Sequence, residues 1–257
     1  MTLPAEVRDL ALRLGADPSR AAGQVTLTQA GSMKLRLEAD LWFPFTARQN
    51  MSVTACAFSW QARFWPFGYL RVVDALEAGE GRMEVKLLGL VPLVRTRPSA
   101  ALTKGELIRY LAELPFAPDA MLHNLALDWR VLDGNRLAVA TGRGALRAEV
   151  ILSLGPDGRV ASVHATDRPR SATPPILPTP WHGCFSDYRQ RQGRWVPFAG
   201  QVAWQIDGQD NLYWRGTLTG WSLLPGMSGA TEPKPGKFLA GSLRVLPPLP
   251  QARPPAG

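Results

Sequence analysis

Residues 103–115 read Thr103-Lys-Gly-Glu-Leu-Ile-Arg-Tyr-Leu-Ala-Glu-Leu-Pro115 and predict the principal helix of the chain. Thr103 and Glu106 have the spacing of a capping box, in which a hydroxyl and a carboxylate each satisfy a free backbone N–H of the first turn. Apolar side chains then recur at helical spacing until Pro115 ends the pattern: Leu107, Tyr110, Leu111 and Leu114. We therefore expect a helix over residues 103–114.

Outside this helix the hydrophobic period is two, which is typical of half-buried strands. Residues 32–42 alternate between apolar and charged side chains, and residues 57–64 and 81–87 repeat the alternation. After the helix, residues 125–132 and 201–206 show it again. The turn sequences between the later strands predict β-hairpins: Asp133-Gly134, Pro156-Asp-Gly158 and Asp207-Gly208.

Together these patterns predict a mainly β (β-rich α+β) fold of about nine to eleven antiparallel strands. A short helix is expected within the first 14 residues, where Val7, Leu10 and Leu14 share one face. We expect a strongly curved antiparallel sheet or half-barrel wrapped around the principal helix. The strands could form one continuous sheet or two half-sheets that meet at the helix. Residues 1–224 are expected to form a single β-rich domain, and the Pro- and Gly-rich residues 225–257 a disordered tail.

Composition and charge limit the class of protein. Of 257 residues, 46% are hydrophobic and 19% charged, so the chain can bury a core. No apolar run is long enough for a transmembrane segment, and the acidic start argues against a signal peptide, so a cytoplasmic location is expected. The net charge of +8 suggests nucleic acid, but acids interleave with the bases, as in Arg82, Glu84 and Lys86. A nucleic-acid partner is therefore not expected.

Motifs of known catalytic chemistry do not occur in the sequence. There is no nucleophile elbow, phosphate-binding loop or zinc-protease helix. His182-Gly-Cys184 pairs two reactive side chains, but a zinc site needs three or four ligands. The two cysteines, Cys56 and Cys184, are expected to be reduced thiols. We assign no catalytic residue, metal ligand or cofactor, and the oligomeric state stays open.

The candidate ligand-binding residues combine polar groups with large aromatics. Arg109 and Glu113 form an i,i+4 pair, which is either a surface ion pair or a polar group facing a cavity inside the sheet. The tryptophans on the inward faces of strands either fill the core or line an apolar cavity. The complete set is Trp60, Arg109, Tyr110, Glu113, Trp129, Arg168, Tyr188 and Trp204.

Arg109-Tyr-Leu-Ala-Glu113, followed by Pro118-Asp-Ala-Met-Leu122, resembles an uncharacterised bacterial family of unknown function. Further matches are residues 43–49, 58–63 and 127–133, and Pro180-Trp-His-Gly183, Asp187-Tyr188, Gly193, Pro197 and Trp204. The resemblance covers roughly residues 3–220 and implies one domain, but it brings no assigned activity. The order of strands, helix and strands is also similar to the bacterial outer-membrane lipoprotein carriers, whose open half-barrel wraps a helix and holds acyl chains.

Three functional hypotheses follow. The first is non-catalytic binding of an apolar or amphipathic small molecule, such as a lipid, in a cavity between curved sheet and helix. The second is an enzyme of unrecognised class that uses carboxylates and arginines near Glu113, Asp187 and Arg168. The third is a protein-interaction or structural domain. An unfilled cavity favours the first, converging carboxylates in a wet cleft the second, and a filled core with an exposed apolar patch the third.

Overall fold

The computed structural model describes residues 3–19, 22–65, 70–87, 91–96, 98–171 and 175–225. These residues form one antiparallel sheet of thirteen strands, two more than the upper end of the predicted range. The strands are β1 (Ala22–Lys34), β2 (Trp42–Ser52), β3 (Phe58–Phe64), β4 (Leu70–Glu77), β5 (Glu80–Leu87), β6 (Val91–Arg95), β7 (Asp128–Asp133), β8 (Arg136–Thr141), β9 (Ala148–Leu154), β10 (Val160–Pro169), β11 (Pro178–Arg191), β12 (Arg194–Ile206) and β13 (Gln209–Pro225). The helices are α1 (Ala5–Arg13), α2 (Ala100–Ala112) and α3 (Ala120–His123), with 3-10 turns at Leu114–Phe116 and Gly144–Leu146.

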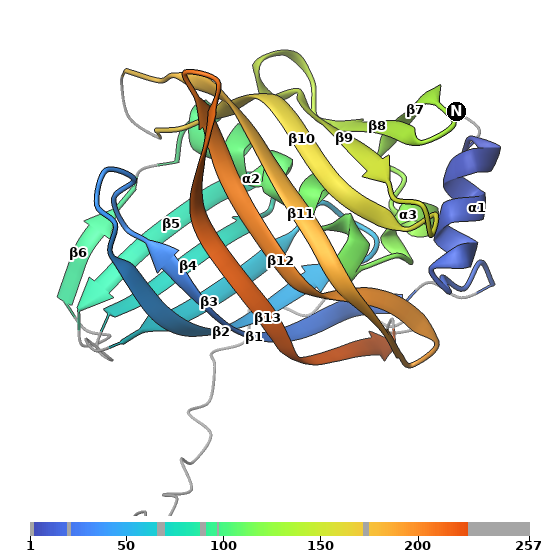
Figure 1. Cartoon of the computed structure of the whole chain (residues 1–257), viewed down its shortest axis with the longest axis horizontal. Coiled ribbons are helices and arrows are strands. Elements are labelled where there is room, and N and C mark those ends of the chain that lie inside the picture. Colours follow the sequence, from blue (N-terminus) through green and yellow to red (C-terminus); the bar gives the residue numbers. More distant parts are fainter. Residues whose placement is uncertain are drawn as a thin grey trace, which may run out of the picture. The chain divides into compact units, whose positions relative to one another are not determined.

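The strand order shows a single continuous sheet. From the middle, β1 to β6 follow one another to one edge, whereas β7 to β13 start at the other edge and return, so that β13 pairs with β1. Helix α2 carries the chain between the two edges and packs against β4 and β5 as well as β8, β9 and β10. Figure 1 shows the sheet curving around this helix. The predicted curved sheet around one principal helix, with a short N-terminal helix, is confirmed.

The start of α2 differs from the sequence-based prediction. The helix begins at Ala100, and the Ser99 side chain accepts a hydrogen bond from the N–H of Leu102. Thr103 lies inside the helix, where its hydroxyl accepts a hydrogen bond of 3.0 Å from the N–H of Gly81 on β5. The predicted capping box is therefore wrong. Thr103 and Glu106 have the right spacing, but both side chains are buried against the sheet and bind partners there.

The predicted strand over residues 32–42 is also wrong. β1 ends at Lys34, and residues 35–41 form the connection to β2, since Lys34 pairs with Trp42. The ammonium of Lys34 lies 2.9 Å from the carboxylate of Asp40 across this connection. Leu35 and Leu41, which were expected to face the core, are 46% and 57% exposed. The connection between two strands of a hairpin can show the same alternation of apolar and charged residues as a strand. The alternation does not depend on whether the backbone pairs with a neighbouring strand.

Other local predictions hold. The strand over residues 57–64 is β3, with Phe58, Trp60, Ala62 and Phe64 buried and the residues between them more exposed. Asp207 and Gly208 have φ of 52° and 75° and form the two-residue turn between β12 and β13, the positive-φ geometry of a tight hairpin. The prediction of a tail over residues 225–257 lies outside the described residues, except for Pro225 at the end of β13.

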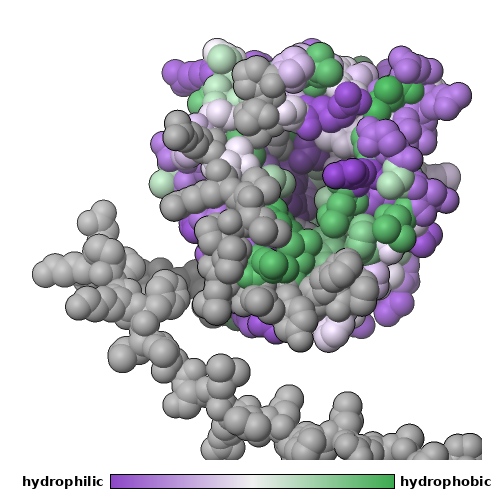
Figure 2. Space-filling view, turned by 90° about the vertical axis from the view of Figure 1, so that its left-hand side faces the viewer, coloured by the Kyte–Doolittle hydropathy of each residue, from purple (hydrophilic) through white to green (hydrophobic). Residues whose placement is uncertain are grey.

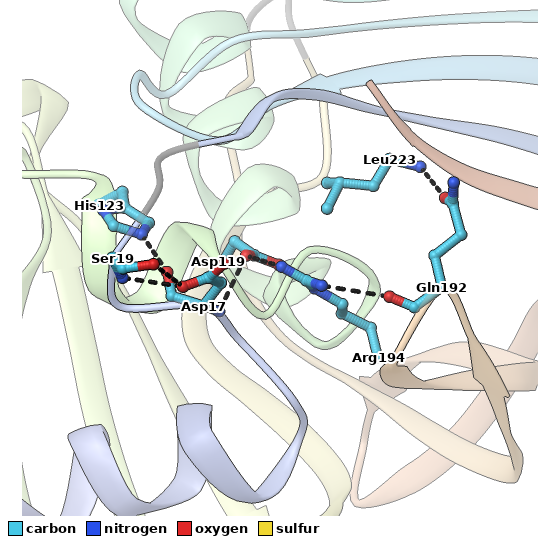
Figure 3. A network of polar contacts seen from close by, with 7 residues as sticks. All are labelled: Asp17, Ser19, Asp119, His123, Gln192, Arg194 and Leu223. Carbon is cyan, nitrogen blue, oxygen red and sulfur yellow. Dashed lines mark hydrogen bonds and ion pairs between the residues drawn. The ribbon is translucent and has the colours of Figure 1, made fainter. Parts of the chain in front are cut away.

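One end of the sheet is closed by a polar network around Asp119 (Figure 3). The buried Asp119 carboxylate accepts hydrogen bonds of 2.8 and 3.1 Å from Arg194 at the start of β12, and one from the N–H of Asp17. His123 Nε2 lies 2.7 Å from the Asp17 carbonyl oxygen. These contacts fasten α3 and the segment after α1 to the β11–β12 hairpin. No helix among the described residues is long and apolar enough to cross a membrane.

Candidate ligand-binding site

The other end of the sheet is open. Because the strands are antiparallel, the β1–β2, β8–β9 and β12–β13 connections lie at this end, as do the ends of β3, β5 and β10 and the starts of β4, β6 and β11. Figure 2 shows a hollow here, with hydrophobic residues along its lower wall and hydrophilic residues at its upper rim and deeper inside. Several large apolar side chains in or beside these connections and strand ends are 38% to 57% exposed: Leu35, Leu41, Trp65, Leu87, Ile176 and Leu177.

Helix α2 turns a charged stripe toward the concave face of the sheet. Glu106, Arg109 and Glu113 are spaced i, i+3 and i+7, so they lie on one side of the helix. The apolar residues Leu107, Ile108 and Leu111 occupy the remaining surface and are buried in the core. A charged stripe inside a curved sheet is unusual, because burying a charge is costly unless it is paired.

Arg109 is the centre of this stripe. Its guanidinium forms an ion pair with Asp74 on β4 and donates from Nε to the Glu113 carboxylate at 3.0 Å. The same guanidinium lies over the rings of Phe58 and Trp60, at 4.9 and 5.0 Å from the ring centroids. Two carboxylates and two ring faces thus surround one cation, which compensates for its burial. The predicted Arg109–Glu113 pair exists, inside the sheet and not on the surface.

Three adjacent strands supply the partners of this cation. Gln49 on β2, Trp60 on β3 and Asp74 on β4 are register partners and therefore point to the same face. Gln49 donates a hydrogen bond to Glu113, and the indole N–H of Trp60 donates to the Gln29 side chain at 2.9 Å. The polar cluster is therefore built into the β2–β4 part of the sheet, where pairing on both sides of each strand holds its geometry.

A second feature of the stripe is a pair of carboxyl groups. Glu106 is buried beside Asp74, and the pKa of Glu106 is raised well above 4.5, first by burial and next by the Asp74 charge and a hydrogen bond to it. Asp74 Oδ1 and Glu106 Oε2 have no other partner among the described residues. A proton held by Glu106 and donated to Asp74 satisfies both oxygens. Sequence reasoning missed both residues as site residues: Glu106 was read as a cap, and Asp74 gave no signal.

Arg168 reaches the concave face through a β-bulge. Between β10 and β11, Ala165 pairs with Trp181 and Arg168 with Thr179, so one strand carries an extra residue. The bulge moves Arg168 to the side of the sheet on which Trp181 lies. Its guanidinium lies over the rings of Trp181 and Trp204, at 4.8 and 5.6 Å. Within the part of the chain that the structure describes, it has no hydrogen-bond acceptor or carboxylate partner, and its charge acts only at longer range on Glu106.

Aromatic side chains pack against one another on the face of the sheet beside Arg168. Trp204 stacks on Tyr213, with centroids 5.9 Å apart and planes at 19°, and the Trp181 indole N–H donates to the Tyr213 hydroxyl at 2.9 Å. Trp181 and Trp204 are register partners on neighbouring strands. Trp204 belongs to the predicted set, whereas Trp181 and Tyr213 do not, although Trp181 stands in the quoted Pro180-Trp-His-Gly183 segment.

The structure brings together five of the eight predicted residues in two groups on the concave side: Trp60, Arg109 and Glu113 in one, Arg168 and Trp204 in the other. Tyr110 is fully buried elsewhere, donating to the Ser52 carbonyl and accepting from Asn124. Tyr188 donates to the Val160 carbonyl at 2.8 Å. Trp129 on β7 is partly buried, and its indole nitrogen has no partner among the described groups.

Asp187, named for the enzyme hypothesis, does not join either group. It lies in an exposed part of β11 at a φ of 55° and pairs with Arg189 at 2.6 Å. His182 lies instead 3.4 Å from the Asp210 carboxylate. Glu113, Asp187 and Arg168 therefore do not converge in one catalytic centre. Cys56 and Cys184 are both free and half-buried, and the described residues contain no cluster of three or more side chains that could hold a metal ion.

A row of glycines forms the floor of the sheet. Gly31, Gly216 and Gly200 pair across β1, β13 and β12, and the rings of Phe45 and Trp214 pack on their backbone. A small pocket, partly open to solvent, lies on this floor and has a cavity volume of about 10 Å³. It is lined by Gln29, Phe116, Phe198, Ala199, Gly200, Trp214, Gly216, Thr217 and Leu218. This volume is below the range of about 300–1,000 Å³ typical of small-molecule sites, so this pocket by itself does not hold such a ligand.

Comparison with solved structures found distant neighbours in fold. A domain assigned to outer membrane lipoprotein sorting, from Vibrio parahaemolyticus, is 11% identical, with 88% of this chain and 93% of that chain covered and a TM-score of 0.47. A LolA superfamily protein from Nitrosomonas europaea is 9% identical over 88% and 95%, with a TM-score of 0.45. A DUF1329 family protein from Desulfovibrio piger is 13% identical over 89% and 95%, with a TM-score of 0.45. At these scores we draw nothing about function from them.

The expected distant similarity to outer-membrane lipoprotein carriers is thus found among these neighbours. The comparison with curated proteins returned no match. At the level of sequence, the model of a family of unknown function, DUF6920, matches residues 1–222. This match includes all thirteen strands, except for the last three residues of β13, and both polar groups on the concave side of the sheet. The chain belongs to the DUF6920 family.

Proposed function

We propose that this protein binds an apolar or amphipathic small molecule, without catalysis, on the concave side of the sheet beneath α2. The observations that carry the proposal are the hollow, whose wall is partly hydrophobic, and the two arginines that lie over aromatic rings on the concave side of the sheet. Aromatic side chains offer large apolar contact areas at a small cost in conformational entropy. The polar groups inside the hollow suit a ligand that has one polar end.

The polar groups on the concave side argue against acid–base catalysis there. The Asp74 carboxylate is held by Arg109, and the Glu113 carboxylate by Arg109 and Gln49. Glu106 is 4% exposed, so water reaches its proton poorly. A general acid or base must come within hydrogen-bond reach of a substrate, and these carboxyl groups are already used by their neighbours. A binding role fits this arrangement better.

Native mass spectrometry of the freshly purified protein tests the proposal. We expect a population heavier than the bare chain, with the added mass recovered by organic extraction. We also expect added fatty acid or hydrophobic dye to raise the melting temperature, because a ligand that binds only the folded state stabilises it. A protein that flies only at its bare mass, and that no such compound stabilises, would contradict the proposal.

A further inference from the structure

The concave side contains two arginines in opposite electrostatic situations. Arg109 is neutralised by Asp74 and Glu113, and a glutamine completes that cluster. Arg168 lies on two tryptophan rings in the same way but has no acceptor for its N–H groups among the described residues. A guanidinium has five N–H donors in a plane, and a ring stacked on its face leaves the edge of that plane free.

A β-bulge and two buried tryptophans fix the position of the Arg168 side chain. The β-bulge between Ala165 and Arg168 turns the side chain inward, and Trp181 and Trp204, both less than 10% exposed, hold the plane of the guanidinium. Tyr213 in turn braces both rings. The neighbouring Asp167 carboxylate, which could have neutralised Arg168, is paired with Lys104 of α2 at 2.5 Å. The acid next to Arg168 in the sequence is thus neutralised by Lys104.

We infer that Arg168 binds the acid head group of an amphipathic ligand, a carboxylate or phosphate attached to an apolar chain. The inference rests on the proposed function and specifies its ligand class. A planar guanidinium fork matches the two oxygens of a carboxylate or phosphate. The Trp181, Trp204 and Tyr213 rings next to the fork provide apolar contact for the first part of the chain. A neutral head group of the same size leaves the positive charge unpaired.

The test is competition for binding against Nile red, an uncharged hydrophobic dye. Four probes separate the head group from the chain: palmitic acid, hexadecyl phosphate, hexadecanol and inorganic phosphate. We expect the two chain-bearing anions to bind roughly tenfold more tightly than hexadecanol, since a hydrogen bond to a charged group is worth about 1.5–3 kcal/mol. Inorganic phosphate alone should not displace the dye. Displacement by inorganic phosphate as strong as that by hexadecyl phosphate would assign the site to a free anion and overturn the inference.

Variants test the residue. Arg168→Gln should weaken binding of palmitic acid about tenfold and leave hexadecanol within about twofold. Arg168→Lys keeps the charge but loses the planar fork, so it should lie between wild type and Arg168→Gln. Arg63→Gln is the matched control, because Arg63 is exposed on the opposite face of β3. It should change neither affinity. Thermal melts of each variant check folding, and Arg168→Lys still tests the inference if Arg168→Gln does not fold.

The outcomes separate this inference from the proposed function. If no chain-bearing probe displaces Nile red from the wild-type protein, the proposed function fails. The inference fails on its own if palmitic acid and hexadecanol bind equally well to wild type, or if Arg168→Gln weakens the binding of both alike. In either case the protein binds apolar molecules, but Arg168 does not bind an acid head group.

Discussion

At the scale of single residues, Glu106 is the group whose chemistry depends most on its surroundings. Burial and the adjacent Asp74 raise its pKa well above 4.5. Between 4.5 and the raised pKa of the folded state, the folded protein keeps a proton that the unfolded chain has lost. Unfolding therefore releases a proton, and rising pH favours the unfolded state. Glu106 thus lowers the stability of the fold progressively as pH rises above about 4.5.

We predict that Glu106→Gln is more stable than wild type near neutral pH. The amide does not titrate, and its NH₂ can donate to Asp74 in place of the carboxyl proton. The difference in unfolding free energy should widen as pH rises and vanish near pH 4.5. Urea denaturation at a series of pH values measures it, with the exposed Glu77→Gln as control. A difference that does not change with pH would contradict a protonated Glu106.

At the scale of elements, two glycines with different surroundings show what helix and sheet each require. Gly105 lies inside α2, and a Cβ added there meets no atom within 4 Å. Gly31 lies on β1 in the glycine row, where a Cβ would be 2.3 Å from the backbone oxygen of Arg215. Close approach of neighbouring strands explains Gly31, whereas no contact requires Gly105.

We predict that Gly105→Ala stabilises the protein by about 0.5–1 kcal/mol, because alanine restricts the unfolded chain and favours the helix. Gly31→Ala should destabilise it, since the rigid backbone of β13 cannot yield. Thermal and urea unfolding of the two variants give the comparison. A destabilised Gly105→Ala would mean that the Cβ position beside α2 is occupied, and an unaffected Gly31→Ala would mean that the strands can separate at the glycine row.

At the scale of the whole molecule, the first and last strands pair with each other in the middle of the sheet. β13 pairs with β1 in the middle of the strand order, so the last described strand is central to the fold. The residues after it are rich in proline and glycine, and the last eleven include five prolines and no aromatic residue. Such a segment has little apolar surface to bury.

We predict that a chain truncated after Pro225 folds as well as the full chain. All thirteen strands end at or before this residue, so no described sheet contact is removed. The melting temperatures of the two proteins should agree within experimental error. Truncation after Thr217 removes the second half of β13, which pairs with the Ala22–Gln29 part of β1, and is the comparison that should abolish soluble expression. A loss of several degrees on removing only residues 226–257 would show that they pack on the domain.

Much of this architecture could be inferred from local patterns. Period-two segments such as β3, the tight turn at Asp207-Gly208 and the apolar stripe of α2 each follow from residues close in the chain. These signals are reliable because backbone geometry gives strands and helices their periods wherever they lie. They led to a curved antiparallel sheet around one helix, and to Arg109, Glu113, Trp60 and Trp204 as candidate ligand-binding residues.

Only the tertiary structure decided the features that make the site distinctive. Arg168 points to the concave face because β10 carries one extra residue in its pairing with β11. The alternation of apolar and polar residues in the sequence does not show this extra residue. The pair of Asp74 and Glu106 joins a strand and a helix that are far apart in the chain, so neither residue alone predicts a shared proton. The same limit misplaced the start of α2 and the strand over residues 32–42. Local sequence sets the period of an element, whereas register and burial, which depend on distant partners, decide which side chains face one another.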